Sequence, residues 1–178
     1  MKLIKWTSII LVLAVGAIYG FNYMTVIQPT QTKIQEDERN EGISVEVHYK
    51  FYVIPTTLVY DLKTVPTDKG AADVFRVFLQ TSSALKDKTF ETIELSYKGQ
   101  TKFLIKGDYF SELGNEFGTQ NPMYTIRTFP ENLFKANGEA AYQQWTGGAL
   151  GVLGKQMEDF NDFNKNWYLD DLVEENRK

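Results

Sequence analysis

The sequence predicts an α+β fold in which one N-terminal transmembrane helix is followed by a single domain. In that domain we expect an antiparallel sheet of about four or five strands, covered by two longer helices and one short helix. Three observations lead to this prediction. Residues 6–27 form an apolar run without a charged side chain, several segments between residues 43 and 127 alternate apolar and polar residues, and segments 68–86 and 139–173 have helical periodicity.

The apolar run 6–27 is long enough to cross a membrane as a helix. At about 1.5 Å of rise per residue it reaches roughly the 30 Å of a bilayer's hydrocarbon core. Trp6 lies at one end and Tyr19 and Tyr23 at the other, where aromatic rings prefer the headgroup boundary. These aromatic ends favour a span that is retained in the mature protein.

The charges around the run predict its orientation. Lys2 and Lys5 precede it, and the first charges after it are mostly acidic, so the positive-inside rule gives a cytoplasmic N-terminus at 1–5. Residues 6–27 are then a signal-anchor, and residues 28–178 lie outside the cytoplasm. We expect a single-pass protein of the cell membrane, with its domain on the periplasmic side if the cell is a Gram-negative bacterium.

A cleaved signal peptide is the alternative interpretation of the same run. Its start is basic, and Val15, Gly16 and Ala17 are small residues of the kind that a signal peptidase prefers. The run is longer than a usual signal-peptide core and has no clear A-x-A site, so we favour the anchor. Gly16 and Gly20 stand four residues apart, as in membrane helices that associate closely, and are the candidate surface for a homo-oligomer.

Composition excludes several classes of function. Without Lys2 and Lys5, the 19 basic residues fall to 17 against 23 acidic ones, a balance of −6 with no basic cluster, which argues against nucleic acid as a partner. There is no cysteine, so zinc–thiolate sites are excluded. There is only one histidine, so catalytic triads are excluded unless His48 acts alone. Alternation puts His48 on a wet strand face, where we expect no ligand role. We accordingly predict no cofactor, no metal site and no catalytic residues.

The pattern changes several times after the apolar run. Residues 28–42 are polar and rich in charge, so we expect a solvated stalk between the membrane and a domain at 43–178. Residues 43–53 alternate strictly, which predicts a strand with one wet face, and a shorter strand is expected at 57–60. A helix start signal then introduces the first long helix of the domain at 68–86.

Two alternating runs on either side of Gly99 predict a β-hairpin. A two-residue loop would put the apolar residues of the two strands on opposite faces. We therefore predict a three-residue loop with Gly99 in the left-handed conformation. In that register Ile93 faces Phe103, and Glu94 faces Lys102 on the outer side.

A short helix at 107–118 and a last strand at 124–127 follow. Polar and aromatic side chains gather where that strand is expected to end, and strand ends are common ligand positions. The candidate polar ligand site consists of Tyr124, Arg127, Glu131 and Asn132. A structural role, in which Arg127 pairs with a carboxylate and Asn132 caps a turn, explains the same residues.

Residues 139–173 predict a long C-terminal helix with one apolar side against the core. Several glycines fall inside this segment, and each destabilises a helix by roughly 0.8–1 kcal/mol relative to alanine. We therefore predict helical geometry there and a close backbone approach by another element, from this chain or from a partner. The candidate partner contact is Gly147, Gly148, Gly151 and Gly154.

The leading functional hypothesis is an extracytoplasmic accessory or protein-interaction subunit without catalytic activity. Its expected partners are the membrane and a membrane protein or protein complex, because the anchor fixes the location and the usual catalytic constellations are missing. The alternative is a small-ligand-binding domain or a carboxylate-dependent hydrolase that uses Glu112, Glu116 or Arg127. Glu112 and Glu116 stand four residues apart on a predicted helix, so both carboxylates could face one cleft.

Overall fold

The computed structural model describes residues 2–175 and 177, and the side chains of residues 9–148, 151–175 and 177. The side chains of Lys2, Lys5 and Trp6, to which the sequence gives a role at the membrane boundary, lie outside this description. The elements in chain order are α1 (Lys2–Asn22), the π-helical turn η1 (Tyr23–Ile27), α2 (Gln28–Gln35), η2 (Glu38–Asn40), β1 (Ser44–Lys50), β2 (Ile54–Thr64), α3 (Ala71–Ala84), β3 (Thr92–Tyr97), β4 (Gln100–Lys106), α4 (Gly107–Glu116), α5 (Pro122–Thr128), η3 (Pro130–Asn132), β5 (Leu133–Phe134), α6 (Ala149–Asn164), the π-helical turn η4 (Lys165–Leu169) and α7 (Asp170–Glu175).

The described strands form one five-stranded sheet in the order β1-β2-β3-β4-β5. Neighbouring strands are antiparallel except β2 and β3, which are parallel. The predicted strand number is confirmed, but the prediction of a wholly antiparallel sheet is wrong. The cause is α3, which lies between β2 and β3 in the sequence and returns the chain to the end of the sheet where β2 began.

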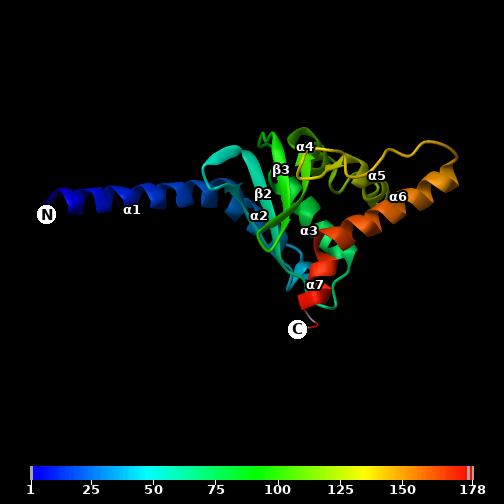
Figure 1. Cartoon of the computed structure of the whole chain (residues 1–178), viewed down its shortest axis with the longest axis horizontal. Coiled ribbons are helices and arrows are strands. Elements are labelled where there is room, and N and C mark those ends of the chain that lie inside the picture. Colours follow the sequence, from blue (N-terminus) through cyan, green and yellow to red (C-terminus); the bar gives the residue numbers. More distant parts are fainter. Residues whose placement is uncertain (1, 176, 178) are drawn as a thin grey trace.

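One face of the sheet packs against α3, α4, α6 and η4 and forms the core (Figure 1). The Tyr60 ring of β2 lies 5.3 Å from the Phe78 ring of α3 and 6.0 Å from the Trp167 ring of η4, measured between centroids. The Trp167 side chain is 1% exposed, and its indole Nε1 donates a hydrogen bond to Ser96 O over 3.1 Å. Aromatic packing therefore joins both long helices of the domain to the middle of the sheet.

The turn of the β3–β4 hairpin differs from the prediction. Lys98 and Gly99 both have positive φ, 48° and 85°, as in a two-residue type I′ turn. The register changes between Leu95 and Ser96, which leaves Lys102 as an extra residue on β4, a β-bulge. The bulge shifts the alternation of β4 by one residue. The apolar residues of β4 therefore lie on the same face as those of β3, whereas a two-residue turn without a bulge would put them on opposite faces.

The bulge has two consequences for the predicted pairs. The apolar residues of β3 and β4 do share the core face, as expected. However, Ile93 faces Ile105 instead of Phe103, and Glu94 faces Leu104 instead of Lys102. The predicted three-residue loop and its pairs are therefore wrong.

Residues 124–127, expected as the last strand, belong to helix α5. The Asn121 side chain accepts a hydrogen bond from Met123 N over 3.0 Å, and Pro122 occupies the first turn. An Asn-Pro pair of this kind is a helix N-cap followed by proline at the first helical position. The last strand is the short β5, which follows η3.

The C-terminal helix starts later than the predicted 139–173. Residues 141–148 are irregular, and Gly147 has a φ of 133°, which is incompatible with a helix. From α6 the helix continues through η4 to Glu175. The wider turn of η4 allows the consecutive residues Trp167 and Tyr168 both to be 1% exposed.

α1, η1 and α2 follow one another without a break, and residues Ile9–Gln35 are long and apolar enough to cross a membrane (Figure 1, blue). The expected long apolar N-terminal helix is thus confirmed. The solvated stalk expected at 28–42 is wrong, because Gln28–Gln35 is helical and Thr30 and Asn40 are 1% and 3% exposed. A segment of low apolar content can still dock when only one narrow side of it is buried.

Candidate functional site

The N-terminal helix is fixed to the domain along a narrow stripe. Asn22, Val26 and Thr30, spaced four residues apart, are 0%, 0% and 1% exposed. Asn22 Oδ1 accepts a hydrogen bond from Tyr49 N over 2.9 Å, and Asn22 Nδ2 donates to Tyr52 O over 2.8 Å. Such bonds contribute about 0.5–1.5 kcal/mol each, and an unsatisfied partner costs more. The helix and the β1–β2 hairpin are therefore held together where α1 ends.

A second connection joins the residues after α2 to helix α3. Asn40 Nδ2 donates to Gln80 Oε1 over 2.6 Å, and Arg76 Nε donates to Asn40 Oδ1 over 3.1 Å. Gln80 Nε2 donates to Asp37 Oδ2 over 3.0 Å. The hydrogen bond from the Arg39 guanidinium holds the pKa of the Asp37 carboxyl well below its usual range. This polar network fixes the residues after α2 to α3, while Asn22 fixes the end of α1 to the β1–β2 hairpin.

β1 lies at the edge of the sheet, and part of its outer edge is unpaired. The register is unbroken from Val45 to Tyr49, and Tyr49 N points away from β2 because it bonds to Asn22. Every second residue of a strand turns its N–H and C=O to the same side, so Val45 and Val47 present theirs to that outer edge. Within the described residues, the N–H groups of Val45 and Val47 make no hydrogen bond.

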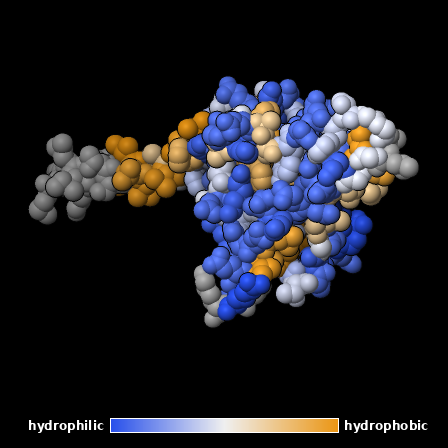
Figure 2. Space-filling model, turned by 45° about the vertical axis from the view of Figure 1, so that its right-hand side comes forward, coloured by the Kyte–Doolittle hydropathy of each residue, from blue (hydrophilic) through white to orange (hydrophobic). Residues whose placement is uncertain are grey.

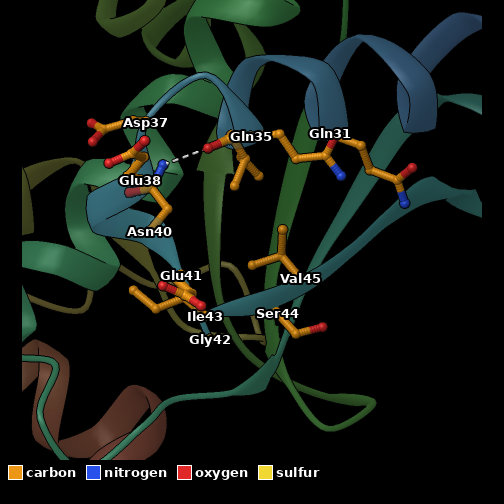
Figure 3. Close-up of a pocket in the computed structure, with 11 residues that line it drawn as sticks. Gln31, Gln35, Asp37, Glu38, Asn40, Glu41, Gly42, Ile43, Ser44 and Val45 are labelled. Atoms are coloured by element: carbon orange, nitrogen blue, oxygen red, sulfur yellow. Dashed lines mark hydrogen bonds between the residues drawn. The ribbon is translucent and has the colours of Figure 1, made fainter.

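Two adjoining hollows follow this edge, and we call them together the β1 edge groove. The larger, of about 650 Å³, lies between α2 and the start of β1, and the smaller, of about 130 Å³, continues toward α1. Gln31 and Val45 line both. Figure 3 shows Gln31 and Gln35 extending from α2 beside β1, and its dashed line is the 2.8 Å hydrogen bond from Asn40 Nδ2 to Ile34 O.

The β1 edge groove combines apolar walls with an acidic end. Its walls include Ile27, Ile34, Ile43 and Val45, and its acidic residues are Asp37, Glu38, Glu41 and Glu46. Among the described residues that line it, none is basic. Glu38 and Glu41 are exposed and make no side-chain ion pair or hydrogen bond within the described part of the chain. An extended segment with basic side chains fits these walls.

The groove also contains a buried polar atom without a partner. Thr30 Oγ1 lines the smaller hollow, is buried, and has no hydrogen-bond partner in the part of the chain that the structure describes. Leaving such a hydroxyl unpaired costs about 1–3 kcal/mol. A bound backbone group along β1 would satisfy it together with the outward N–H groups of the strand.

The four residues of the predicted polar ligand site lie on α5 and η3. The Arg127 guanidinium lies 5.9 Å from the centroid of the Tyr124 ring. Asn132 Nδ2 donates to Thr128 O over 3.0 Å and so closes the end of α5, as in the predicted structural role. Burial raises the pKa of Glu131. Helical geometry thus brings Tyr124 and Arg127 together, while Asn132 is used by the backbone.

The four glycines of the predicted partner contact have open surroundings. Gly147 and Gly148 precede α6, and only Gly151 and Gly154 are helical. A Cβ at any of the four would meet no atom within 4 Å. The predicted close approach by another element of this chain is therefore wrong within the described residues, and contact with a partner stays a prediction.

Close backbone approaches occur instead at two glycines that the sequence analysis did not single out. A Cβ at Gly107 would collide with Phe90 O, and one at Gly114 would collide with Ser82 O. Ser82 Oγ also donates to Phe110 O over 2.5 Å, so α3 and α4 touch through their backbones at this point. Gly114 follows Leu113 on the buried side of α4, whereas the glycines of α6 are exposed. A position next to a core residue is therefore the feature of the sequence that indicates a close approach at Gly114.

The two carboxylates of the hydrolase alternative do not face a second acid. Glu112 is exposed, and Glu116 lines a mainly apolar hollow of about 400 Å³ between α3, α4 and α5. Among the described residues around that hollow, Glu116 is the only carboxylate. Arg39 and Arg76 are also there, and both are paired with Asp37.

His48 has surroundings that fit a structural role, and the two glycines of α1 have open surroundings. His48 is half-buried and stacks on Tyr52 with 4.4 Å between ring centroids, while its Nδ1 lies 2.8 Å from Tyr49 O. Gly16 and Gly20 lie on α1, where a Cβ would meet no described atom within 4 Å. That part of α1 is therefore open to a second helix or to lipid.

Comparisons with protein-family models, with curated proteins and with solved structures gave no match for this chain. Its function is therefore argued from its geometry. The β1 edge groove was not among the sequence candidates, because it needs α2 to dock. The groove has one signal in the sequence, the four-residue spacing of Asn22, Val26 and Thr30. In a helix this spacing puts Asn22, a polar residue within the apolar run, on the same side as Thr30 of the expected stalk.

Proposed function

We propose that this chain is a membrane-anchored interaction subunit outside the cytoplasm that holds an extended, basic segment of a partner membrane protein in the β1 edge groove. The segment adds as a further strand to β1. The observation that supports this is the outward-facing, unpaired N–H groups of Val45 and Val47 beside a hollow of about 650 Å³. Strand edges pair readily with other chains; here Asn22 occupies the edge at Tyr49, and the two hollows adjoin it at Val45.

The proposed anchor is α1, with Lys2 and Lys5 on the cytoplasmic side of the cell membrane. In a Gram-negative bacterium the domain is then periplasmic. Because Asn22 at the end of α1 is already buried in the domain, the groove begins at the membrane surface, with Tyr19 lining its near end. The partner segment is therefore one that lies next to the membrane.

The acidic end of the groove sets the chemistry of the partner segment. Glu38 and Glu41 stand at the end of the groove that lies farther from α1, and a basic side chain there gains a charge-assisted hydrogen bond. The domain as a whole is acidic, which assists the approach of a basic segment at low salt.

Site-specific crosslinking in native membranes tests the proposal. The chain has no cysteine, so Gln31→Cys introduces a single attachment point for a photocrosslinker inside the groove. We expect it to form a covalent adduct with a basic, membrane-proximal segment of one protein, identified by mass spectrometry. Gln100→Cys, exposed at the β3–β4 turn, is the control and should give no adduct. Equal adducts from both positions, or an adduct only from Gly151→Cys on α6, would contradict the groove as the binding site.

A pair of proline variants separates strand addition from other contacts in the groove. Val45→Pro removes an outward N–H and leaves the bonds to β2 in place, so we expect it to abolish the Gln31 adduct with little change in thermal stability. Glu46→Pro removes an N–H that faces β2 and should destabilise the sheet itself. A Val45→Pro variant that still gives the adduct would show that the partner does not pair with β1.

A further inference from the structure

The turn between β1 and β2, residues 51–53, and the first residue of β2 expose large apolar side chains. Phe51 is 72% exposed, Val53 58% and Ile54 38%. Beyond the N-terminal helix, the described chain has only three other exposed large apolar residues, Met123, Tyr124 and Val173. The exposed apolar surface of the domain is thus concentrated in one turn, which we call the β1–β2 turn.

The β1–β2 turn is attached to the end of α1. Asn22 Nδ2 donates to Tyr52 O over 2.8 Å, and Figure 1 shows the turn, in cyan, beside the place where α1 enters the domain. Phe51 and Tyr52 have φ values of 52° and 64°, which bulky residues rarely adopt. A strained backbone that directs an aromatic ring into solvent is a feature of functional sites.

The length of α1 places the β1–β2 turn at the boundary of a bilayer. After Lys2 and Lys5 on the cytoplasmic side, residues 6–22 of α1 rise by roughly 25 Å, which is about the shortest helix that crosses a hydrocarbon core. Figure 2 shows the apolar surface of this helix ending where the largely hydrophilic visible face of the domain begins. Since Asn22 is where the helix enters the domain, the turn that it holds lies at the level where the helix leaves the membrane.

We propose that the β1–β2 turn is a second membrane contact, in which Phe51 and Val53 enter the boundary between headgroups and acyl chains beside α1. Lipid is the occupant because the turn continues the apolar surface of the proposed span. Its composition also fits, since Lys50 Nζ lies 5.6 Å from the centroid of the Phe51 ring, and aromatic residues with lysine are typical of membrane interfaces. One helix fixes the position of the domain, and the second contact fixes its rotation and tilt. This inference rests on the proposed anchor.

Depth-dependent fluorescence quenching tests the contact in the full chain. Phe51→Cys and Val53→Cys each provide one labelling site for an environment-sensitive fluorophore, and both side chains are exposed, so folding is preserved. The labelled proteins are reconstituted into phosphatidylcholine vesicles with doxyl quenchers placed near the headgroups or deep in the acyl chains. Val12→Cys on α1 is the positive control. Gln100→Cys is the negative control, because the β3–β4 turn lies at the opposite end of the sheet.

We expect the probes at 51 and 53 to be quenched severalfold more than the probe at 100, and more strongly by shallow than by deep doxyl groups. If the probe at 12 is quenched while those at 51 and 53 match the probe at 100, the contact does not exist although the anchor does. If the probe at 12 is not quenched either, the anchor is wrong and the inference falls with it. Blue-shifted emission at 51 and 53 without quenching by lipid would show a protein on the turn, which also overturns the proposal.

Discussion

The two terminal helices of the chain are each docked firmly to the domain at one end, and their other ends, which we call the free halves, have different surfaces. In α1 the consecutive residues Ile10, Leu11, Val12 and Leu13 are 63%, 66%, 70% and 67% exposed. In the free part of α6 the exposed positions are small or charged, Gly151, Gly154 and Lys155, and the apolar residues between them are half-buried.

This difference supports the proposed membrane anchor at α1 and gives no such support at α6. Consecutive exposed apolar residues cover every side of a helix, and such a surface is stable only in lipid or inside a protein. The free half of α6 has the glycine and charge content of a helix in water or against a polar partner. The position of a helix beside a sheet therefore does not determine its environment, whereas the distribution of residues around the helix does.

The docked end of the C-terminal helix should show the largest effect. Trp167→Ala removes a side chain that is 1% exposed and should lower the free energy of unfolding by about 3–5 kcal/mol, because it leaves a cavity against Tyr60 and Phe163. Thermal unfolding of the reconstituted chain, followed by circular dichroism, measures it. Trp145→Ala is the control, since Trp145 is only half-buried before α6, and it should cost much less. Equal losses would mean that α6 is docked along its whole length.

A charge placed in each free half separates their environments. Val12→Arg should reduce the membrane-integrated fraction, because arginine at the centre of a transmembrane helix costs about 2.5–3.5 kcal/mol on insertion scales. Gly151→Arg in α6 should leave that fraction unchanged, since Gly151 is exposed and a Cβ there meets no atom within 4 Å. Carbonate extraction of membranes measures the fraction. Full integration of the Val12→Arg variant would contradict the assignment of α1 to lipid.

The docked end of the N-terminal helix depends on one side chain. Asn22→Ala leaves the buried Tyr49 N without its partner, at a cost of about 1–3 kcal/mol, and also removes the part-buried hydrogen bond to Tyr52 O. We expect a lower unfolding temperature and faster hydrogen exchange in the β1–β2 hairpin. Thr25→Ala is the matched control, because Thr25 Oγ1 bonds only to Phe21 O of its own helix, and it should be nearly neutral. A neutral Asn22→Ala would show that the helix and the hairpin are not coupled.

Two helical glycines should respond to alanine with opposite signs. Gly151→Ala should raise the free energy of unfolding by about 0.4–1 kcal/mol, because the new methyl group meets nothing and helix propensity improves. Gly114→Ala should lower it by about 1–3 kcal/mol, since its Cβ would collide with Ser82 O. Denaturant unfolding compares the two. Destabilisation by Gly151→Ala in the isolated chain would restore the close approach predicted from the sequence.

Local patterns predicted much of the sheet and its covering helices. The alternation of residues 43–53 predicted β1 with one buried face, where Val47 and Tyr49 lie, but the strand ends at Lys50 and Phe51 is exposed in the turn. The helix predicted at 107–118 is α4. These predictions succeed because the side-chain period depends only on the local backbone. The register of the hairpin failed because a bulge at Lys102 changes that period, and alternation alone does not show an extra residue.

The parts that failed more completely depend on tertiary contacts. The segment 28–42 has too few apolar residues to be recognised as part of the core, yet Asn40 and Gln80 bury polar groups against each other. The strand predicted at 124–127 is a helix because the Asn121 side chain caps α5. The β1 edge groove could not be predicted for the same reason. It exists only when α2 lies beside β1, and residues 28–42 were expected to form a solvated stalk.

Hydrogen exchange in lipid nanodiscs tests most directly the central claim, that one continuous helix holds the domain against the membrane without a flexible stalk. The account predicts that the backbone amides of Tyr23–Ile27 and Gln28–Gln35 exchange as slowly as those of the central strand β2, because they are hydrogen-bonded and docked. If they exchange as fast as those of the irregular segment 141–148, residues 28–42 are a solvated stalk and the β1 edge groove has no second wall.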